Sequence, residues 1–414
     1  MTELDLEFVR RQFPAFDHPE MGQWAFLENA GGAYAPSHVI DKLNHFMVAT
    51  KVQPYGPSGP SEEAGRAMDL SHERLAAAIN ADVDEVMFGP STSINTYVVA
   101  QALKERLRTG DEVIVTNQDH EANSGVWRRL ADGNSGVIVR EWAVDPETGR
   151  LDMAGLQRLL NERTRFVAVT HCSNVAGEIH DVAAIALQVH DAGALLAVDG
   201  VSYAPHDLPD VHALGVDFYF FSLYKTYGPH QGLMYVRRSV LEGIANQAHI
   251  FNADNPRARL TPAGPQHGEI ACASGVVDYL EAVDAHHYGD DDTPACRDRV
   301  ARIMALFHSH ETEQAARILA LLRDKDVRII GPERADVGKR APTIAFRSNS
   351  VSNADVVARL RADKIACGAG HFYAYRLVEA LGIDPNDGVV RLSLVHYNSA
   401  DEVFRLLNVL DDVL

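Results

Sequence analysis

Short apolar runs alternate with amphipathic helical stretches between about residue 65 and residue 240. The apolar runs, mostly four to seven residues long and rich in Val, Ile, Phe and Tyr, predict strands at 86–88, 112–116, 136–142, 165–170, 195–199, 218–222 and 232–237. Helical periodicity between them predicts helices at 93–108, 152–160 and 182–192. Strands that alternate with helices are typical of a largely parallel sheet covered on both faces. The pattern therefore predicts an α/β fold with a mostly parallel seven-stranded sheet.

The pattern changes after residue 240. Segment 252–268 is rich in Pro, Gly and Asn and predicts a loop, which a helix at 269–285 and an acidic linker at 288–294 follow. The remaining predicted elements are helices at 297–324, 354–362 and 400–413 and strands at 327–330, 343–346, 365–367 and 389–394. This order predicts a smaller α+β domain.

These changes predict three divisions of the chain. They are an N-terminal segment, 1–25, which we expect to pack with the small domain, a large domain at 26–290, and a small C-terminal domain at 295–414.

Composition excludes several classes of protein. The 414 residues are 46% hydrophobic and 23% charged, without repeats or low-complexity segments, which excludes disordered, collagen-like and coiled-coil chains. The formal net charge of −19 argues against a nucleic acid or an anionic membrane as the main partner. No apolar run approaches the roughly 18 residues of a membrane span, and no signal peptide is visible. Four widely spaced cysteines do not form a disulfide framework, so a cytoplasmic protein is expected.

Polar residues gather where the predicted strands end. They lie in the segments FGPSTSIN (88–95), NQDHEAN (117–123), THCSN (170–174), AVDGVS (197–202) and FSLYKTYGPHQG (221–232). Because ligands bind at the carboxyl ends of strands in open α/β sheets, we expect these segments to form one rim.

Lys225 and Asp199 carry the most specific chemistry in this rim. Among seven lysines, Lys225 alone follows a fully apolar strand, DFYFFS, so burial should lower its pKa and make its amine nucleophilic. Asp199 ends the apolar segment LLAVDG, where an unpaired carboxylate would be costly. Pyridoxal phosphate needs both groups, a lysine for its aldehyde and an acid for its ring nitrogen. The alternatives are a strand-end lysine that reaches solvent and an aspartate that caps a helix.

Ser91 and Thr92 stand directly before the predicted helix 93–108. The amides of a helix N-terminus and two hydroxyl groups form a suitable phosphate site, although a plain N-cap has the same residues. The sequence contains no Walker A motif, no GxGxxG fingerprint after a strand, no HExxH and no GxSxG. His308 and His310 are two residues apart on a predicted helix and so point to different faces. No metal site is expected.

These features together resemble the fold-type-I pyridoxal-phosphate enzymes. The chain is similar to the class V aminotransferase group that includes cysteine desulfurases, selenocysteine lyases and isopenicillin epimerases. The resemblance runs from FLENAGGAYAPSHVI (26–40) to VVRLSLVHYNS (389–399), and the spacing of 26 residues between Asp199 and Lys225 is similar to the family pattern.

The resemblance implies a role for each matching residue. Lys225 would bind the cofactor and move the substrate's α-proton, Asp199 would pair with the pyridinium nitrogen, and His120 would stack on the cofactor ring. Ser91, Thr92 and Ser222 would bind phosphate. Asn174 would contact the cofactor's phenolic oxygen or the substrate carboxylate, which Arg391 would clamp. Ser202 and Tyr224 stand at cofactor-binding positions that usually hold Gln and His.

The resemblance also implies a homodimer with shared active sites. A loop similar to AGPQHGE (263–269), which contains Gln266, would complete the phosphate site of the neighbouring subunit.

One departure from the family bears on the reaction. Desulfurases carry a nucleophilic cysteine on a loop similar to GAGHFYAYR (368–376), and Tyr373, expected to contact substrate, stands at that position here. Cys367, six residues earlier, is expected to be a buried structural thiol.

The expected function is that of a pyridoxal-phosphate enzyme acting on a small amino acid. The substrate would form an external aldimine and lose its α-proton to Lys225, in an aminotransferase-like reaction or a C–S or β-elimination. Alternatives are an epimerase, or a desulfurase or selenocysteine lyase that uses an atypical residue in place of the loop cysteine. A binding protein without cofactor and a nicotinamide dehydrogenase are disfavoured.

Overall fold

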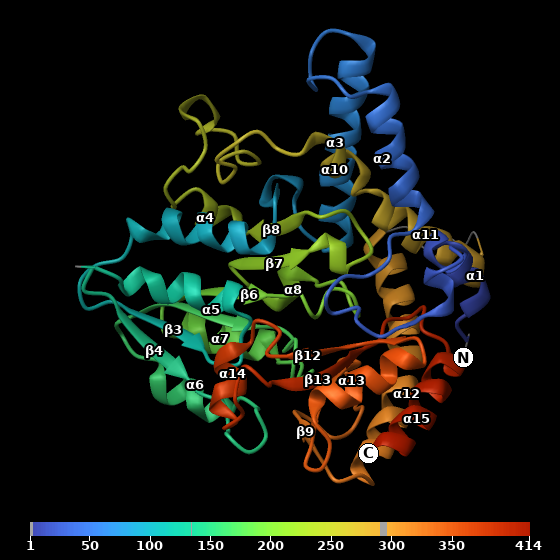
Figure 1. Ribbon diagram of the computed structural model, residues 1–414. Helices are drawn as coiled ribbons and strands as arrows, with labels where there is room; N and C mark the ends of the chain where they lie inside the picture. Colours follow the sequence, from blue (N-terminus) through green and yellow to red (C-terminus); the bar gives the residue numbers. More distant parts are fainter. Residues whose placement is uncertain (1–2, 134, 290–295) are drawn as a thin grey trace.

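The large sheet forms the centre of the molecule. The computed structural model describes residues 3–133, 135–289 and 296–414, and in this part of the chain seven strands pair in the order β2-β8-β7-β6-β5-β3-β4 (Figure 1). The strands are β2 Val86–Gly89, β3 Glu112–Thr116, β4 Ile138–Trp142, β5 Thr164–Thr170, β6 Leu195–Asp199, β7 Phe218–Ser222 and β8 Gly232–Val236. β8 runs antiparallel to both neighbours, and the other pairings are parallel. The predicted mostly parallel seven-stranded sheet is confirmed.

Helices cover both faces of this sheet. One face packs against α4 Thr92–Lys104, α5 Glu121–Arg128 and α9 Arg238–Leu241, and the other against α3 Gly59–Ala78, α7 Val182–Asp191 and α11 Gly275–Tyr288. Successive residues of a strand point to opposite faces, so Phe218 and Phe220 join the first core while Tyr219 and Phe221 join the second. Burial on both faces explains why these strands are apolar throughout.

The C-terminal part contains a separate antiparallel sheet with the order β12-β13-β10-β9. Its elements are α12 Cys296–Arg323, β9 Val327–Ile330, β10 Thr343–Ser348, α13 Asn353–Ala362, β12 Gly368–Gly370, α14 Tyr375–Ala380, β13 Val389–Ser393 and α15 Ala400–Val413. The predicted strand 365–367 appears as β11 Ile365–Ala366, which pairs with β1 Ala25–Phe26 rather than with this sheet.

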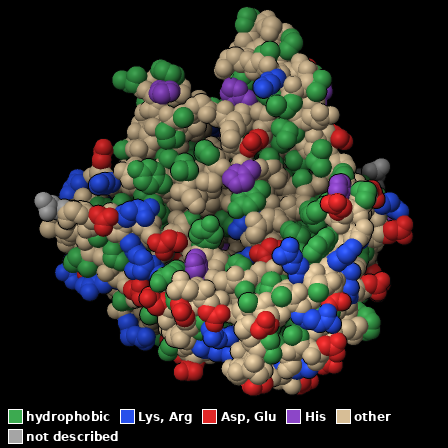
Figure 2. Space-filling model, viewed as in Figure 1, with side chains coloured by type: hydrophobic (Ala, Val, Ile, Leu, Met, Phe, Trp, Pro, Cys, Tyr) green, Lys and Arg blue, Asp and Glu red, His purple; other side chains and the backbone are tan. Residues whose placement is uncertain are grey.

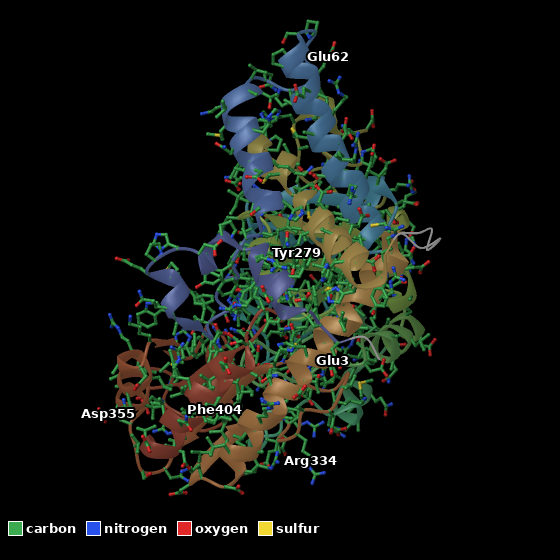
Figure 3. The ribbon with its side chains drawn as sticks, turned by 90° about the vertical axis from the view of Figure 1, so that its right-hand side faces the viewer. Glu3, Glu62, Tyr279, Arg334, Asp355 and Phe404 are labelled. Atoms are coloured by element: carbon green, nitrogen blue, oxygen red, sulfur yellow. The ribbon has the colours of Figure 1, made fainter. Side chains whose placement is uncertain are left out.

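The N-terminal helix contacts the C-terminal part of the chain. α1 Leu6–Arg11 carries Arg10, which donates to the carbonyl of Tyr397 and forms an ion pair with Glu402 on α15 (2.9 Å each). α2 Ser37–Ala49 and α3 project together at the top of both ribbon views (Figures 1 and 3). In Figure 3, Glu62 marks the tip of this projection and Phe404 marks α15 at the opposite end.

The expectation of one helix at 269–285 is wrong. Two helices, α10 His267–Cys272 and α11, meet at Ala273–Ser274. The backbone of Gly275 lies so close to α2 that an added Cβ would stand 2.6 Å from the carbonyl oxygen of His38, and this contact fixes the bend. Residues 290–294 of the predicted acidic linker lie outside the described residues.

The remaining described elements are short. They are α6 Met153–Leu159, α8 Val211–Leu214 and the 3₁₀ turns Pro14–Phe16, Met21–Gln23, Val83–Glu85, Arg129–Ala131, Leu223–Lys225 and Ile250–Asn252. No helix among the described residues has the length and apolar character needed to cross a bilayer.

Candidate active site

A pocket lies at the carboxyl ends of β2, β5, β6 and β7 and at the N-terminus of α4. It encloses about 530 Å³ of empty space, counted with its open mouth. Its lining residues are Ser91, Thr92, Ser93, His120, Ala122, Thr170, Cys172, Asn174, Asp199, Val201, Ser202, Ser222, Tyr224, Lys225 and His230. The rim predicted from the strand ends is therefore a single pocket. Figure 2 shows that the molecule is hollowed on the face in view.

Lys225 lies in the 3₁₀ turn that follows β7 and is buried. Removal of its ammonium group from water, helped by the nearby charge of Arg391, lowers the pKa of Lys225 to about 8. The Nζ atom lies 5.8 Å from the ring centroid of Tyr224, which forms one wall of the pocket. At pH 7 about one-tenth of this amine is unprotonated and nucleophilic, far more than for a lysine with its ordinary pKa.

Asp199 ends β6, next to β7 in the sheet, with Asp199 in register with Phe220. Its Oδ1 accepts a hydrogen bond from the amide of Val201 (2.9 Å), and burial raises the pKa of Asp199 to about 6. A buried carboxylate of this kind is costly without a cationic partner, so this position favours a ligand that carries a positive charge next to Asp199.

The N-terminus of α4 contributes hydroxyl and amide groups to the same pocket. Ser91 is the N-cap of α4, and Thr92 Oγ1 lies 2.8 Å from Ser222 Oγ at the end of β7. β8 begins at Gly232 directly beneath them, where an added Cβ would lie 2.4 Å from the backbone carbon of Ser91 and 2.6 Å from the amide nitrogen of Thr92. A glycine at 232 thus allows the strand to support this turn closely.

His120 is the N-cap of α5, and its Nδ1 accepts a hydrogen bond from the amide of Ala122 (3.1 Å). Burial lowers the pKa of His120 to about 3, with smaller effects of Lys225 and Arg391. The ring is therefore neutral and carries its proton on Nε2. It stacks on the ring of Tyr373, with centroids 5.1 Å apart and an interplanar angle of 26°. An apolar, flat surface thus borders the pocket.

Arg391 reaches this region from the middle of β13 in the small sheet. Its Nη1 donates to the carbonyl of Asn174 (3.2 Å), its Nη2 to Glu28 Oε1 (2.7 Å), and its guanidinium carbon lies 3.8 Å from the ring centroid of Phe372. Asn174 Nδ2 donates to the carbonyl of Phe372 (2.8 Å), which leaves its Oδ1 buried without a hydrogen-bond partner.

The loop of Phe372 and Tyr373 adopts an unusual backbone conformation. Both residues have a positive φ (47° and 61°), a conformation that costs energy for side chains with a Cβ. The Tyr373 carbonyl accepts a hydrogen bond from the amide of Glu121 at the start of α5 (2.8 Å). The loop that carries Tyr373, which follows β12 of the small sheet, therefore contacts the start of α5 next to His120.

The structure does not place every predicted residue in the lining of this pocket. Arg391 and Tyr373 lie next to it, in contact with Asn174 and His120, without lining it. Ser202 and Tyr224 line it, whereas Gln266 lies elsewhere, in a separate hollow between α4 and segment 260–266, where it hydrogen-bonds with Gln231.

The sequence did not indicate His230, Thr170, Cys172 or Glu28 as site residues. His230 stacks on Tyr224 with centroids 4.6 Å apart, and its position in the segment FSLYKTYGPHQG was a signal for it.

None of the four thiols is prepared for nucleophilic attack. Burial raises the pKa of Cys172, Cys272 and Cys367 to about 12 each, and it also raises the pKa of Cys296. The described residues contain no group of three or more His, Cys, Asp or Glu side chains arranged to hold a metal ion.

This donor set fits pyridoxal phosphate. The pocket holds a buried amine for the aldehyde in Lys225, a buried acid for the ring nitrogen in Asp199, and a hydroxyl-lined helix N-terminus for the phosphate.

Comparison with known proteins supports this identification. The family described as aminotransferase class-V matches residues 25–249 and 301–406. The aminotransferase-like protein FGM3 of Gibberella zeae is 35% identical and covers 100% of this chain and 99% of its own length. The cysteine desulfurase-like protein ustD of Aspergillus flavus is 31% identical, covering 99% of this chain and 91% of its own length.

Solved structures of cysteine desulfurases have the same fold. The Escherichia coli cysteine desulfurase CsdA superposes with a TM-score of 0.83 at 25% identity, over 99% of this chain and 98% of that one. The apo cysteine desulfurase of Thermococcus onnurineus has a TM-score of 0.85 at 24% identity, over 100% of this chain and 98% of its own. The chain therefore belongs to the class-V aminotransferase family of pyridoxal-phosphate-dependent enzymes.

Proposed function

We propose that this enzyme acts on a small amino acid and that Lys225 removes the proton from its α-carbon. The observation that carries the proposal is the pairing, at adjacent strand ends of one pocket, of a buried amine with a lowered pKa and a buried carboxyl with a raised pKa. Pyridoxal phosphate, when bound, supplies an electron sink for the negative charge that develops at the α-carbon. Lys225 Nζ would hold the aldehyde in the resting enzyme. The substrate amine would replace it at that carbon, and the released lysine amine would then take up the α-proton.

The other residues of the site would bind and orient the cofactor and the substrate. A protonated ring nitrogen would supply Asp199 with the cationic partner that its buried carboxylate lacks. The hydroxyls of Ser91, Thr92 and Ser222 and the N-terminus of α4 would bind the phosphate. Arg391 would hold the substrate α-carboxylate. Asn174 Oδ1 is buried without a hydrogen-bond partner, so it is available to accept a hydrogen bond from a donor on the ligand.

The state of the thiols favours some of the possible reactions over others. Transfer of sulfur to the enzyme needs a thiolate near the substrate, and burial keeps each of the four thiols protonated at neutral pH. Tyr373 occupies the loop that borders His120, and a phenol does not accept sulfur. An aminotransferase-like reaction or a C–S or β-elimination is therefore favoured over a desulfurase reaction that forms an enzyme persulfide.

Product analysis with the pyridoxal-phosphate-loaded enzyme and a panel of small amino acids tests this proposal. A keto acid formed together with pyridoxamine phosphate indicates transamination, and pyruvate or sulfide in solution indicates elimination. Exchange of the α-proton with inversion, without other products, would indicate an epimerase and overturn the assignment. Persulfide on the protein, detected by mass spectrometry, would overturn the argument from the thiols.

We further propose that the enzyme is a homodimer, formed through the face around α2, α3 and segment 245–266. Ile250, Phe251 and Val48 are at least 80% exposed there. Tyr55 and Phe251 line a broad hollow between the α2–α3 projection and this segment, seen as a notch at the top of Figure 2. Large exposed apolar surfaces of this kind mark interfaces. Gln266, which lies on this face outside the pocket of its own chain, would then contact the phosphate of the partner.

A further inference from the structure

Arg391 already has a carboxylate partner within the chain. Glu28, in the segment between β1 and α2, contacts Arg391 Nη2 through Oε1 at 2.7 Å. The two residues lie 363 positions apart in the sequence, so only the fold brings them together. A substrate carboxylate that binds Arg391 therefore meets a guanidinium group that is already engaged by an anion.

The contact between Glu28 and Arg391 is incomplete. Glu28 Oε2 and Arg391 Nε are both buried without a hydrogen-bond partner. Arginine and carboxylate groups commonly form two parallel hydrogen bonds, and buried polar atoms in a permanent structural pair are normally satisfied. The pair has one hydrogen bond, with Arg391 Nε as an unused donor and Glu28 Oε2 as an unused acceptor. A carboxylate that forms two hydrogen bonds with Arg391 can therefore replace Glu28.

The two partners also differ in their freedom to move. The Arg391 side chain is 3% exposed, between Phe372 on one face of its guanidinium and the Asn174 carbonyl at its edge. The Glu28 side chain is 27% exposed, so it can turn toward water without the cost of burying an unpaired charge. Arg391 is therefore the fixed member of the pair, and Glu28 the member that can leave.

We propose that Glu28 is a specificity-determining residue, which occupies Arg391 in the substrate-free enzyme and is displaced by the α-carboxylate of the substrate. This inference rests on the proposed role of Arg391. Two carboxylates on one guanidinium repel each other, so binding requires the exchange. Only a ligand whose ionised carboxylate forms both hydrogen bonds with Arg391 competes successfully with Glu28. Glu28 therefore raises KM and leaves kcat nearly unchanged.

The test measures the affinity of propionate, a carboxylate without an amine, for the pyridoxal-phosphate-loaded enzyme by titration calorimetry. Glu28→Gln removes the competing charge at nearly the same size and leaves only a neutral, weaker acceptor for Arg391, so propionate should bind about tenfold more tightly. Glu28→Ala should change the affinity in the same direction. Glu141→Gln, which removes the partner of Arg128 at the edge strand β4, is the matched control and should leave it unchanged.

The outcomes separate this inference from the function on which it rests. One outcome would overturn the inference alone. In it, Arg391→Gln abolishes propionate binding, whereas Glu28→Gln leaves the affinity unchanged or weakens it. Binding that persists in Arg391→Gln, or that is absent from every variant, would contradict the role proposed for Arg391. Propionamide should not bind measurably to the wild type or to Glu28→Gln, because it cannot form the ionic pair.

Discussion

Burial shifts the pKa values of Lys225 and Asp199 in opposite senses. The pKa of Lys225 falls to about 8 and that of Asp199 rises to about 6, because both groups lose water and each makes only limited use of the other's charge. Both shifts therefore cost stability near pH 7, where the unfolded chain would carry both charges freely. A cofactor with an aldehyde and a protonated ring nitrogen relieves both costs, so these residues favour binding over stability.

Asp199→Asn should therefore separate stability from cofactor binding. At pH 7 the substitution should stabilise the cofactor-free protein by about 1–3 kcal/mol, because a buried charge is removed, and it should lower activity at least 100-fold. The pKa of Asp199 is raised from its ordinary 3.8 to about 6, so the stabilisation is present above about pH 6 and shrinks steeply as the pH falls toward 4. It is lost below about pH 3, where the wild-type group is protonated in both states. Urea unfolding of cofactor-free protein at pH 4 and pH 7 measures it. Equal differences at the two pH values would contradict the assignment.

At the scale of secondary structure, strand ends and helix starts assemble the pocket. β6 and β7 place Asp199 and Lys225 side by side, and α4 begins where β8 supports it through Gly232. The position of the α4 N-terminus therefore depends on Gly232, a residue that has no side chain.

Gly232→Ala tests this dependence. The added methyl group would overlap the backbone of Ser91 and Thr92, which must shift by several tenths of an ångström or more. We expect pyridoxal phosphate to dissociate at least tenfold more readily, since phosphate contacts depend on the helix amides, and the protein to lose about 1–3 kcal/mol of stability. Fluorescence titration with cofactor measures the first effect. Gly243→Ala, where the atom nearest to an added Cβ is Nη1 at the end of the flexible Arg106 side chain (3.3 Å), is the control.

The sequence predicted the elements that have strong local patterns. β3, β6 and β7 match the predicted bounds because each is a continuous apolar run that ends in a polar residue. β1 and β12 are only two and three residues long, too short for any periodicity, and were not predicted. The contact between Glu28 and Arg391 could not be predicted either, because each residue was visible in its motif but nothing local connects them. The pocket, in contrast, followed from the general rule that ligands bind at strand ends.

At the scale of the whole molecule, the protein carries a net charge of −19, whereas its pocket contains Lys225 and lies close to Arg391. An anionic cofactor and a carboxylate substrate are therefore attracted only close to the site, where these cations and the α4 N-terminus lie. The proposed division of the chain at residues 26–290 and 295–414 stays a prediction. The hydrogen bonds from Arg391 to Asn174 and Glu28 nevertheless join residues on the two sides of this division.

Phe251→Asp should disrupt the proposed dimer. Phe251 is 80% exposed in the isolated chain and lines the hollow beside α3, so a charge at this position would be buried against the partner. Sedimentation velocity should show a dimer for the wild type and monomers for the variant, with weaker cofactor binding because Gln266 no longer reaches the partner. Phe404→Asp, on exposed α15, is the matched control. A wild-type monomer that binds cofactor with full affinity would contradict the proposal.

The central claim is that Lys225 binds pyridoxal phosphate, and borohydride reduction of the loaded enzyme followed by peptide mass mapping tests it most directly. The chain has seven lysines, so the position of the added mass is decisive. The structure predicts one cofactor mass on the peptide that contains Lys225, and none on Lys225→Ala treated in the same way. Cofactor mass on another lysine, or equal labelling of Lys225→Ala, would contradict the account.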